Sequence, residues 1–553
     1  MEFIACKNLS FAYNSSERQV CKNITFSVNK GEIALLCGRS GCGKTTLLKL
    51  LKKEISPVGK LSGKIIFCGK DISQIDARES AEKIGFVMQN PDLQTVTDKV
   101  SSELVFGLEN LGVQSDEIRR RIGEVSNFFG IENLYNKDIH TLSGGQKQLC
   151  NLCSVMVMNP DLLILDEPTA QLDPVAAQNF IFALKRLNNE LGLTIIIAEH
   201  DPEEIFPAAD RVLFMENGEI IINAAPKAAA KKMLQQGEKM DFFLTSAARI
   251  CGETVLGEQI PLTVKEGKIF AEENFAAVSF KNKREDFTDK EIVLKGENLW
   301  FRYERNSSDI LKGVDFQLHK SEFLAVLGSN GTGKTTLLNA LGGIGKCYRG
   351  KVYALGKRTK DYKNGTLYKN LLAILPQNPY ALFIKDSVRR DYENLLKSMG
   401  SAENHEKISH ISKQLGIENL LDRHPYDLSG GEAQKCAIGK ILLTEPQIIL
   451  CDEPTKGLDI CSKKEIGLLL NNLQKRGISI CAVTHDVEFA AEYADKCSLF
   501  FDGRILSCDT PEKFFSTNSF YTTAACRIAR NVFKGAVTVS QVKKCIAEQE
   551  GAV

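Results

Sequence analysis

The sequence predicts an α/β protein in which helices cover both faces of a mostly parallel sheet, and it predicts that this arrangement occurs twice. Two observations support this fold class. Short apolar runs rich in β-branched residues, such as 194–198 and 447–451, alternate with stretches of helical spacing. In addition, a set of glycine-rich and acidic motifs recurs in the same order in both halves of the 553 residues.

The composition is typical of a soluble protein of several domains, with 43% hydrophobic and 25% charged residues. The 70 basic and 69 acidic residues nearly cancel, so we expect no nucleic-acid partner. The apolar runs are shorter than the roughly 18 to 20 residues of a membrane-spanning helix. The first five residues are not those of an export signal, and the 17 cysteines are expected to be reduced.

A glycine-rich loop that ends in lysine and threonine is the first repeated motif. It spans 38–45 and recurs at 328–335, so that Lys44 and Lys334 lie 290 positions apart. Its glycines let backbone N–H groups surround a phosphate, the next helix adds its positive end, and the lysine adds a full charge. The expected nucleotide-binding residues are Gly38, Ser40, Gly41, Gly43, Lys44, Thr45 and Thr46, and Gly328, Asn330, Gly331, Gly333, Lys334, Thr335 and Thr336.

Two apolar strands, expected at 162–166 and 448–452, each end in a pair of acids. Carboxylates at the C-terminal ends of strands lie where an open α/β sheet binds its ligands. Asp166 and Asp452 are therefore expected to bind Mg²⁺ together with the hydroxyl groups of Thr45 and Thr335. The adjacent acids are expected to polarise the attacking water. These catalytic candidates are Glu167 and Glu453, followed along the chain by His200 and His485.

A Leu-Ser-Gly-Gly run precedes each acid pair at the same spacing. Ser143 lies 23 residues before Asp166, and Ser429 lies 23 residues before Asp452. With this run, both halves resemble ATPase domains of the ABC type over nearly the whole chain. The resemblance implies a RecA-like parallel-sheet core with a helical subdomain in each half, a head-to-tail pairing of the halves, and ATP and Mg²⁺ as cofactors. It also implies that Ser143, Gly144 and Gly145 cover the nucleotide held by Lys334, and that Ser429, Gly430 and Gly431 cover the one held by Lys44.

The same resemblance assigns further residues. Gln89 and Gln377 would sense Mg²⁺ and the membrane partner, while His200 and His485 would contact the γ-phosphate. Asp173 and Asp459 would carry signals between the halves. Tyr13 and Tyr303 would stack on adenine, although an aromatic residue on an early strand is often a core residue. Gln146 and Glu432 differ at one position of the otherwise matching motifs, and this difference in charge leaves open whether the two sites are kinetically equal.

The repeats predict four regions. These are an ATPase domain at 1–225, a small subdomain with a linker at 226–290, a second ATPase domain at 291–510, and a helical tail at 511–553. Similar segments at 242–250 and 520–528 end the two halves, and each is expected to form a helix that packs against its counterpart.

The segment 89–112 closely resembles the ATPases of energy-coupling factor transporters, which import vitamins and transition-metal ions; the second half resembles them less after Pro379. This predicts an energy-coupling subunit at the cytoplasmic face of the membrane, with an integral scaffold subunit and a substrate-binding membrane subunit as partners. The alternative is a tandem ATPase that acts on ribosomes. That class usually has a long charged hairpin between its halves, and a third class, DNA-repair ATPases, has large zinc modules; neither feature is visible here.

Overall fold

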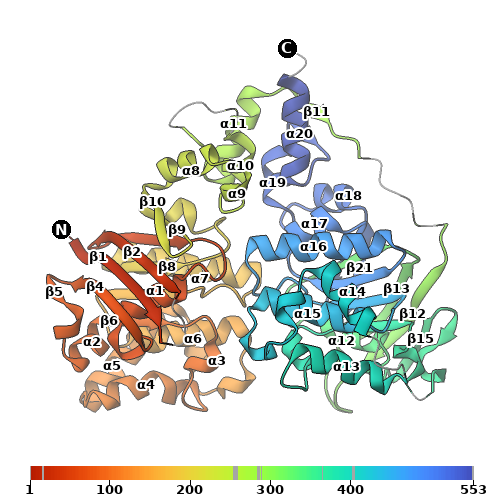
Figure 1. The fold of residues 1–553 in the computed structure, drawn as a ribbon, viewed down its shortest axis with the longest axis horizontal. Helices are drawn as coiled ribbons and strands as arrows, with labels where there is room; N and C mark the ends of the chain where they lie inside the picture. Colours follow the sequence, from red (N-terminus) through yellow and green to blue (C-terminus); the bar gives the residue numbers. More distant parts are fainter. Residues whose placement is uncertain are drawn as a thin grey trace. The chain divides into compact units, whose positions relative to one another are not determined.

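The computed structural model describes residues 2–14, 18–252, 254, 259–282, 287, 289–363, 365–400 and 405–550, without the side chains of residues 238, 239 and 550. The chain divides into two compact units, Met1–Thr263 and Val264–Val553 (Figure 1). The last three residues of the predicted tail lie outside the described residues. Within the described residues, no helix combines the length and the hydropathy that a bilayer crossing needs.

A six-stranded sheet forms the centre of the first unit. Its order is β10 (Glu219–Ala224), β9 (Arg211–Glu216), β3 (Ile33–Cys37), β8 (Thr194–Ala198), β7 (Leu162–Asp166) and β6 (Ile84–Val87). All neighbouring pairs are parallel except β9 with β10. Every residue of β3, β7 and β8 is buried, as expected for strands covered on both faces. The predicted α/β class is confirmed.

A second sheet, which the sequence analysis did not anticipate, is antiparallel. Its order is β2 (Gln19–Asn29), β1 (Glu2–Tyr13), β4 (Gly59–Phe67) and β5 (Lys70–Asp71). Apolar side chains of this sheet, including Leu9 and Phe11, share one buried core with Leu36 of β3 and with helix α1 (Lys44–Leu50). The loop between β3 and α1 is thereby fixed at both ends.

A helical region lies between β6 and β7. It contains α4 (Val100–Asn110), α5 (Ser115–Phe129) and α6 (Gly144–Met156), which share an apolar core. The short helices α2 (Ala77–Lys83) and α3 (Pro91–Gln94) flank β6, and α7 (Pro174–Leu191) joins β7 to β8.

The second unit repeats this plan (Figure 1). Its larger sheet has the order β17 (Leu372–Leu375), β18 (Ile448–Asp452), β19 (Ser479–Thr484), β14 (Phe323–Leu327), β20 (Lys496–Phe501) and β21 (Arg504–Asp509). Its antiparallel sheet has the order β13 (Leu311–His319), β12 (Ile292–Phe301), β15 (Arg349–Ala354) and β16 (Lys357–Arg358). Its helices are α12 (Lys334–Leu341), α13 (Val388–Ser398), α14 (His405–Leu415), α15 (Gly430–Leu442), α16 (Ile460–Lys475) and α17 (Val487–Tyr493).

Each unit ends in short helices. The first has α8 (Pro226–Gln235), α9 (Glu238–Asp241) and α10 (Ser246–Cys251); the second has α18 (Pro511–Thr517), α19 (Ala524–Ala529), strand β22 (Phe533–Lys534) and α20 (Val539–Glu550). The joining segment adds α11 (Val264–Asn274), which packs against α19, and β11 (Val278–Ser279), which pairs with β22. The expected packing of the segments 242–250 and 520–528 against each other stays a prediction.

Candidate functional site

The glycine-rich loop of the first unit connects the buried strand β3 to helix α1. Gly38 has φ +148°, and a Cβ atom there would lie 2.2 Å from the carbonyl oxygen of Met215. Gly43, with φ +110°, is the residue before the first turn of α1. These two positions exclude side chains, so backbone N–H groups can face the space at the helix start.

Lys44 carries the charge of this loop and is almost completely buried. Its Nζ donates to the carbonyl oxygens of Gly38 (2.8 Å) and Arg39 (3.3 Å) and lies 3.6 Å from Oε1 of Glu167. The ammonium group is thus held between the loop and the acid pair at the end of β7.

Asp166, the last residue of β7, faces the helix that carries the lysine. Thr45 Oγ1 donates to its Oδ1 at 3.1 Å. Burial, followed by the neighbouring charge of Glu167, raises the pKa of Asp166 to about 6. A hydroxyl and a carboxylate oxygen at this distance are ligand types that Mg²⁺ prefers, so these residues fit that ion.

Glu167 has a left-handed backbone conformation, φ +47°, which is unusual for a residue other than glycine. Its Oε1 lies 2.7 Å from Nε2 of His200, and its Oε2 accepts a hydrogen bond of 2.7 Å from Nε2 of Gln89. Burial alone would raise the pKa of Glu167, but the hydrogen bond with His200 and the charge of Lys44 outweigh it, so the pKa lies below its usual value. Such a carboxylate stays ionised and can accept a proton from water.

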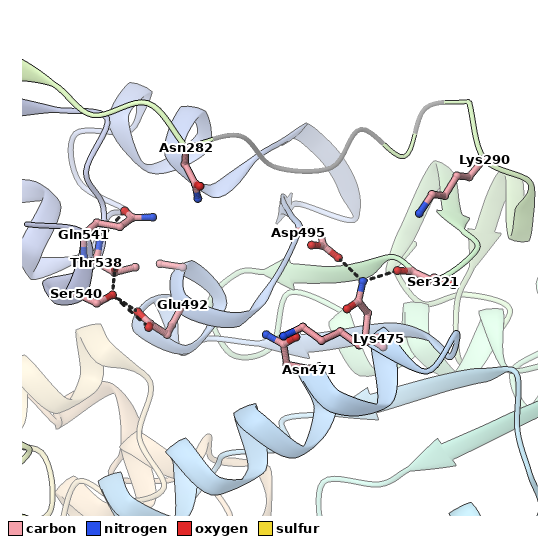
Figure 2. A pocket seen from close by; sticks show the side chains of 12 residues that line it. Asn282, Lys290, Ser321, Asn471, Lys475, Glu492, Asp495, Thr538, Ser540 and Gln541 are labelled. Atoms are coloured by element: carbon pink, nitrogen blue, oxygen red, sulfur yellow. Dashed lines mark hydrogen bonds between the residues drawn. The ribbon is translucent and has the colours of Figure 1, made fainter. Parts of the chain in front are cut away.

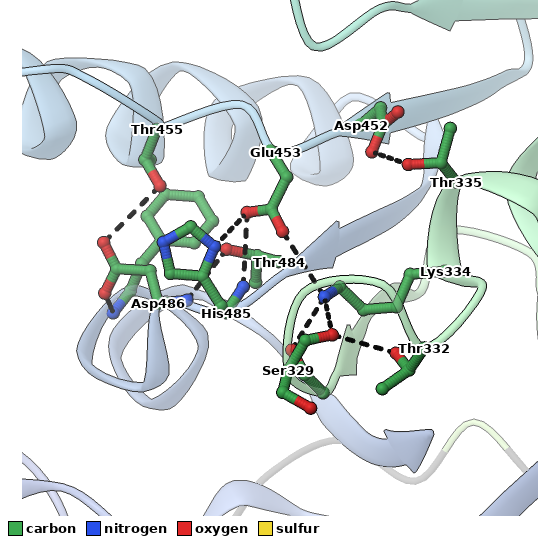
Figure 3. A network of polar contacts seen from close by, with 12 residues as sticks. Ser329, Thr332, Lys334, Thr335, Asp452, Glu453, Thr455, Thr484, His485 and Asp486 are labelled. Carbon is green, nitrogen blue, oxygen red and sulfur yellow. Dashed lines mark hydrogen bonds and ion pairs between the residues drawn. The ribbon is translucent and has the colours of Figure 1, made fainter. Parts of the chain in front are cut away.

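The second unit has the same constellation (Figure 3). Lys334 Nζ donates to the carbonyl oxygens of Gly328 (2.7 Å) and Ser329 (2.9 Å) and lies 3.6 Å from Glu453. Thr335 Oγ1 donates to Oδ1 of Asp452 at 3.1 Å, and burial raises the pKa of Asp452 to about 6. The backbone of Glu453 is also left-handed, with φ +48°.

Two contacts of the glutamates differ between the units. Oε2 of Glu453 lies 2.9 Å from Nδ1 of His485, whereas Glu167 faces the other ring nitrogen of His200. Gln377 is exposed, and within the described residues no hydrogen bond joins it to Glu453. Among the described residues, a direct hydrogen bond between this glutamine and the glutamate is therefore present in the first unit alone, while the expected role of Gln89 and Gln377 toward Mg²⁺ stays a prediction.

A buried carboxyl group that the sequence analysis missed lies beside the first constellation. Glu199, the residue before His200, is 4% exposed, and its Oε1 accepts a hydrogen bond from the backbone N–H of Thr169 at 3.0 Å. Burial raises the pKa of Glu199 to about 8. Thr484 occupies the matching position of the second unit, where Thr455 instead donates its hydroxyl to Asp486 at 3.4 Å. The sequence feature that could have indicated Glu199 is that the first repeat has Glu-His at 199–200 where the second has Thr-His at 484–485.

The Leu-Ser-Gly-Gly runs begin helices α6 and α15. Ser143 and Ser429 are N-caps, and each forms a capping box with the residue three positions later, Gln146 or Glu432. A Cβ atom at Gly145 would lie 3.0 Å from that of Ala176 in α7, and one at Gly431 would lie 2.7 Å from Oγ of Ser462 in α16. Within the described part of the first unit, no hydrogen bond or ion pair joins residues 143–145 to the lysine and acid cluster.

The two early tyrosines lie next to the phosphate-loop helices. The hydroxyl group of Tyr13 is 2.9 Å from Oγ1 of Thr46, and that of Tyr303 is 3.1 Å from Oγ1 of Thr336. Tyr303 is 70% exposed, so it is not a core residue, and Tyr13 is half-buried. Both rings are placed beside the start of the helix that follows the loop.

Residues 21–170 and 311–456 match the family model described as ABC transporter. The chain belongs to the ABC transporter family. The two matches together cover more than half of it, one in each unit, and they identify the chain as an ATPase with two ATP-binding domains.

The similarity to individual proteins of this family extends over nearly the full length. A protein of Bacillus thuringiensis subsp. konkukian (strain 97-27), provisionally named an ABC transporter ATP-binding protein, is 42% identical over 97% of each chain. One of Bacillus subtilis (strain 168), provisionally named an HMP/thiamine import ATP-binding protein, is 31% identical over 93% of each chain. An archaeal ribosome recycling factor, solved in complex with an archaeal ribosomal stalk protein, has the same fold, with a TM-score of 0.58 and 20% identity over 92% of this chain and 91% of that one.

Proposed function

We propose that each unit of this ABC ATPase holds and hydrolyses one MgATP. Lys44 and Lys334 bind the β- and γ-phosphates, while Tyr13 and Tyr303 stack on adenine. The observation that carries the proposal is the repeat, in both units, of the lysine, threonine, acid pair and histidine at nearly equal distances. A constellation built for packing alone would not need two left-handed glutamates at matching positions.

Mg²⁺, when bound, would neutralise part of the negative charge of the phosphates. Thr45 with Asp166 and Gln89, and Thr335 with Asp452 and Gln377, are the residues that would hold it. Glu167 and Glu453 would orient the attacking water and accept its proton, because the lowered pKa of each keeps its carboxylate ionised. His200 and His485 hold these carboxylates in place and would contact the γ-phosphate.

We further infer that the two units share their sites head to tail. Residues 143–145 would cover the nucleotide on Lys334, and residues 429–431 the one on Lys44. Their position at the first turns of α6 and α15 supports this, because helix N-termini favour the negative charge of a phosphate. ATP would then hold the units closed, and hydrolysis would release them.

The proposed task of this ATPase is energy coupling in an importer of the energy-coupling factor type, for a vitamin or a metal ion. The residues after Gln89 and the thiamine-import name of the 31% identical relative support this class. Membrane subunits are the general partners of ABC ATP-binding proteins. The partners proposed here are an integral scaffold subunit and a substrate-binding subunit, with the ATPase at the cytoplasmic face of the membrane.

Purification of the protein from native membranes, with mass spectrometry of what accompanies it, tests this task. We expect a small integral scaffold protein and a second membrane subunit in stoichiometric amounts, and we expect ATP with vanadate to change their retention. Co-purification with ribosomal particles and without membrane proteins would replace the importer by a ribosome-acting ATPase.

A further inference from the structure

Three residues after His200 and after His485 lies a glutamate whose side chain points away from the site and contacts the C-terminal helices of the same unit. The histidine loops are defined here as residues 200–203 and 485–488. In the first, Oε2 of Glu203 accepts hydrogen bonds from the backbone N–H (2.8 Å) and the hydroxyl group (3.1 Å) of Ser246. In the second, Oε1 of Glu488 accepts one from the backbone N–H of Ala524 at 2.8 Å.

The two contacts are equivalent. Thr245 and Thr523 are the N-caps of α10 and α19, so Ser246 and Ala524 are both the first residue of their helix. The first N–H groups of a helix have no acceptor within the helix, and a carboxylate near them is favoured by the helix dipole. The same hydrogen bond, from a helix's first N–H to a glutamate, is thus present in both units, although its two residues are 43 positions apart in one unit and 36 in the other.

Local hydrogen bonds order the backbone in and directly after each histidine loop. In the first loop, Asp201 accepts the N–H of Glu203 at 3.0 Å, and Phe206 donates to the carbonyl oxygen of Pro202 at 2.9 Å. In the second, Asp486 caps α17 by accepting the N–H of Phe489 at 3.0 Å. Because only two residues separate glutamate and histidine, a shift of the glutamate moves the imidazole that faces the catalytic carboxylate.

The second unit has a further contact between helix α17 and its C-terminal helices. Ser540 Oγ lies 3.3 Å from both carboxylate oxygens of Glu492, a residue of α17, on the wall of an open polar pocket (Figure 2). Helix α17 is therefore held to the C-terminal segment at two successive turns. In the first unit, Glu203 accepts two hydrogen bonds from Ser246, and its burial raises its pKa to about 7.

We propose that Glu203 and Glu488 are positioning residues for ATP hydrolysis, which hold His200 and His485 in place by fixing the histidine loops to the first turns of α10 and α19. They touch neither nucleotide nor metal in this proposal. The C-terminal helices of each unit then contribute to the rate of hydrolysis.

Proline substitution removes the donor with little other change. Proline is favoured at the first position of a helix, and the preceding threonines have φ and ψ of −62° and 155°, and −69° and 155°, which a following proline requires. We expect the double variant Ser246→Pro/Ala524→Pro to lower kcat by about tenfold through misplacement of the histidines. The affinity for ATP should change less than twofold, because the phosphate loops are not involved. Ser115→Pro, at the exposed first position of α5, is the matched control and should leave kcat unchanged.

Substitution from the acceptor side provides the second test. Glu203→Gln/Glu488→Gln keeps an oxygen that can accept the N–H and should retain at least half of kcat, whereas Glu203→Ala/Glu488→Ala should lose about as much as the proline variant. Equal activity of the alanine and glutamine variants would overturn the proposal. So would a normal kcat of the alanine pair, or a loss of kcat that only accompanies a lower unfolding temperature and weaker ATP binding. If the proline variant does not fold, the comparison of alanine with glutamine decides alone.

Discussion

The two glutamates proposed as catalytic bases combine an unfavourable backbone conformation with a well-defined side-chain environment. Glu167 and Glu453 have φ of +47° and +48°, and each donates its N–H to the neighbouring strand, to Ala198 (2.9 Å) or Val483 (2.8 Å). A left-handed glutamate costs about 1–3 kcal/mol and persists only where its surroundings fix it. Here the conformation turns the carboxylate toward the lysine and the histidine.

Separate substitutions Glu167→Gln and Glu453→Gln test whether both sites hydrolyse ATP. Each change should slow turnover at its own site by about 10²–10⁴-fold, because an amide cannot accept the proton of the water. The measurement is steady-state phosphate release by each single variant and by the double variant. Glu190→Gln, on an exposed face of α7, is the control. A single variant with undiminished hydrolysis would show that only the other site works.

Glu199 predicts a pH dependence of stability. Burial raises the pKa of this carboxyl group from 4.5 to about 8, so the folded chain binds its proton more tightly than the unfolded chain does. Between these two pH values unfolding releases a proton, and stability falls as pH rises. Glu199→Gln keeps the acceptor for Thr169 and should stabilise the protein at pH 8 by on the order of 1–3 kcal/mol, and less at pH 6.

Urea unfolding of the Glu199→Gln variant and the native chain at pH 6 and pH 8 measures this difference. The variant's gain in the free energy of unfolding should be larger at pH 8 than at pH 6, and it should appear in the unfolding transition of the first unit. An equal shift at both pH values would mean that Glu199 does not titrate in this range.

At the scale of elements, the structure changes the interpretation of one motif difference. The exchange of Gln146 for Glu432 left open whether the sites are equal, but each of these side chains accepts the N–H of the preceding cap serine, at 3.1 Å and 2.9 Å. Glu432 Oε2 also accepts the hydroxyl proton of Ser429 at 2.8 Å. Both residues therefore cap the start of their helix in the same way.

Exchange of these two residues tests the capping interpretation. In Gln146→Glu/Glu432→Gln each helix keeps an oxygen acceptor at its third position, so turnover should stay within about twofold and helix stability within about 0.5 kcal/mol. ATP hydrolysis and thermal unfolding are the measurements. A tenfold change in turnover would show instead that the charge at residue 432 acts on the nucleotide.

The sequence predicted the parallel strands well and the antiparallel sheets not at all. Strands such as β7 and β8 are uninterrupted apolar runs, buried on both faces. In β1 and β12 the pairing register shifts, and Asn8 and Asn298 have φ of 49° and 46°, so the alternation of polar and apolar residues is broken. The bulges interrupt the two-residue periodicity by which a strand is recognised in a sequence.

At the scale of the whole molecule, the joining segment connects the two ATPase halves physically. Helix α11 begins at Val264 directly after a threonine, as α20 begins at Val539, so the two helices have similar starts. Helix α11 packs on α19 of the second unit. Directly after these helices, Phe275 contacts Phe533 with ring centroids 5.6 Å apart, and Asn531 donates to Glu272 of α11 at 2.7 Å.

A protease site inserted after Asn282, and cut in the folded protein, tests whether this packing holds the halves together. The cut protein should stay one particle in gel filtration without nucleotide. Ala271→Glu, which places a charge at a fully buried position of α11, should release the halves, because an unpaired buried charge costs several kcal/mol.

Ala277→Glu, the same change at an exposed position, is the control, and the two fragments of its cut protein should stay associated. A cut protein that separates without any substitution would assign α11 no role in association. Deletion of the residues after Ser516, with unchanged association of separately expressed halves, would argue in the same way against the C-terminal tail.

The sequence by itself determined the α/β class, the duplication, and the lysines, acid pairs and histidines, because the chemistry of phosphate allows few residue types at fixed spacing. Only the tertiary structure decided which residues from distant parts of the chain contact these groups and the segments that carry them. Glu199, the contacts of Glu203 and Glu488, and the packing of α11 on α19 join segments that are distant in the chain. Such contacts arise where strand ends and helix ends meet in space, and a linear pattern does not record them.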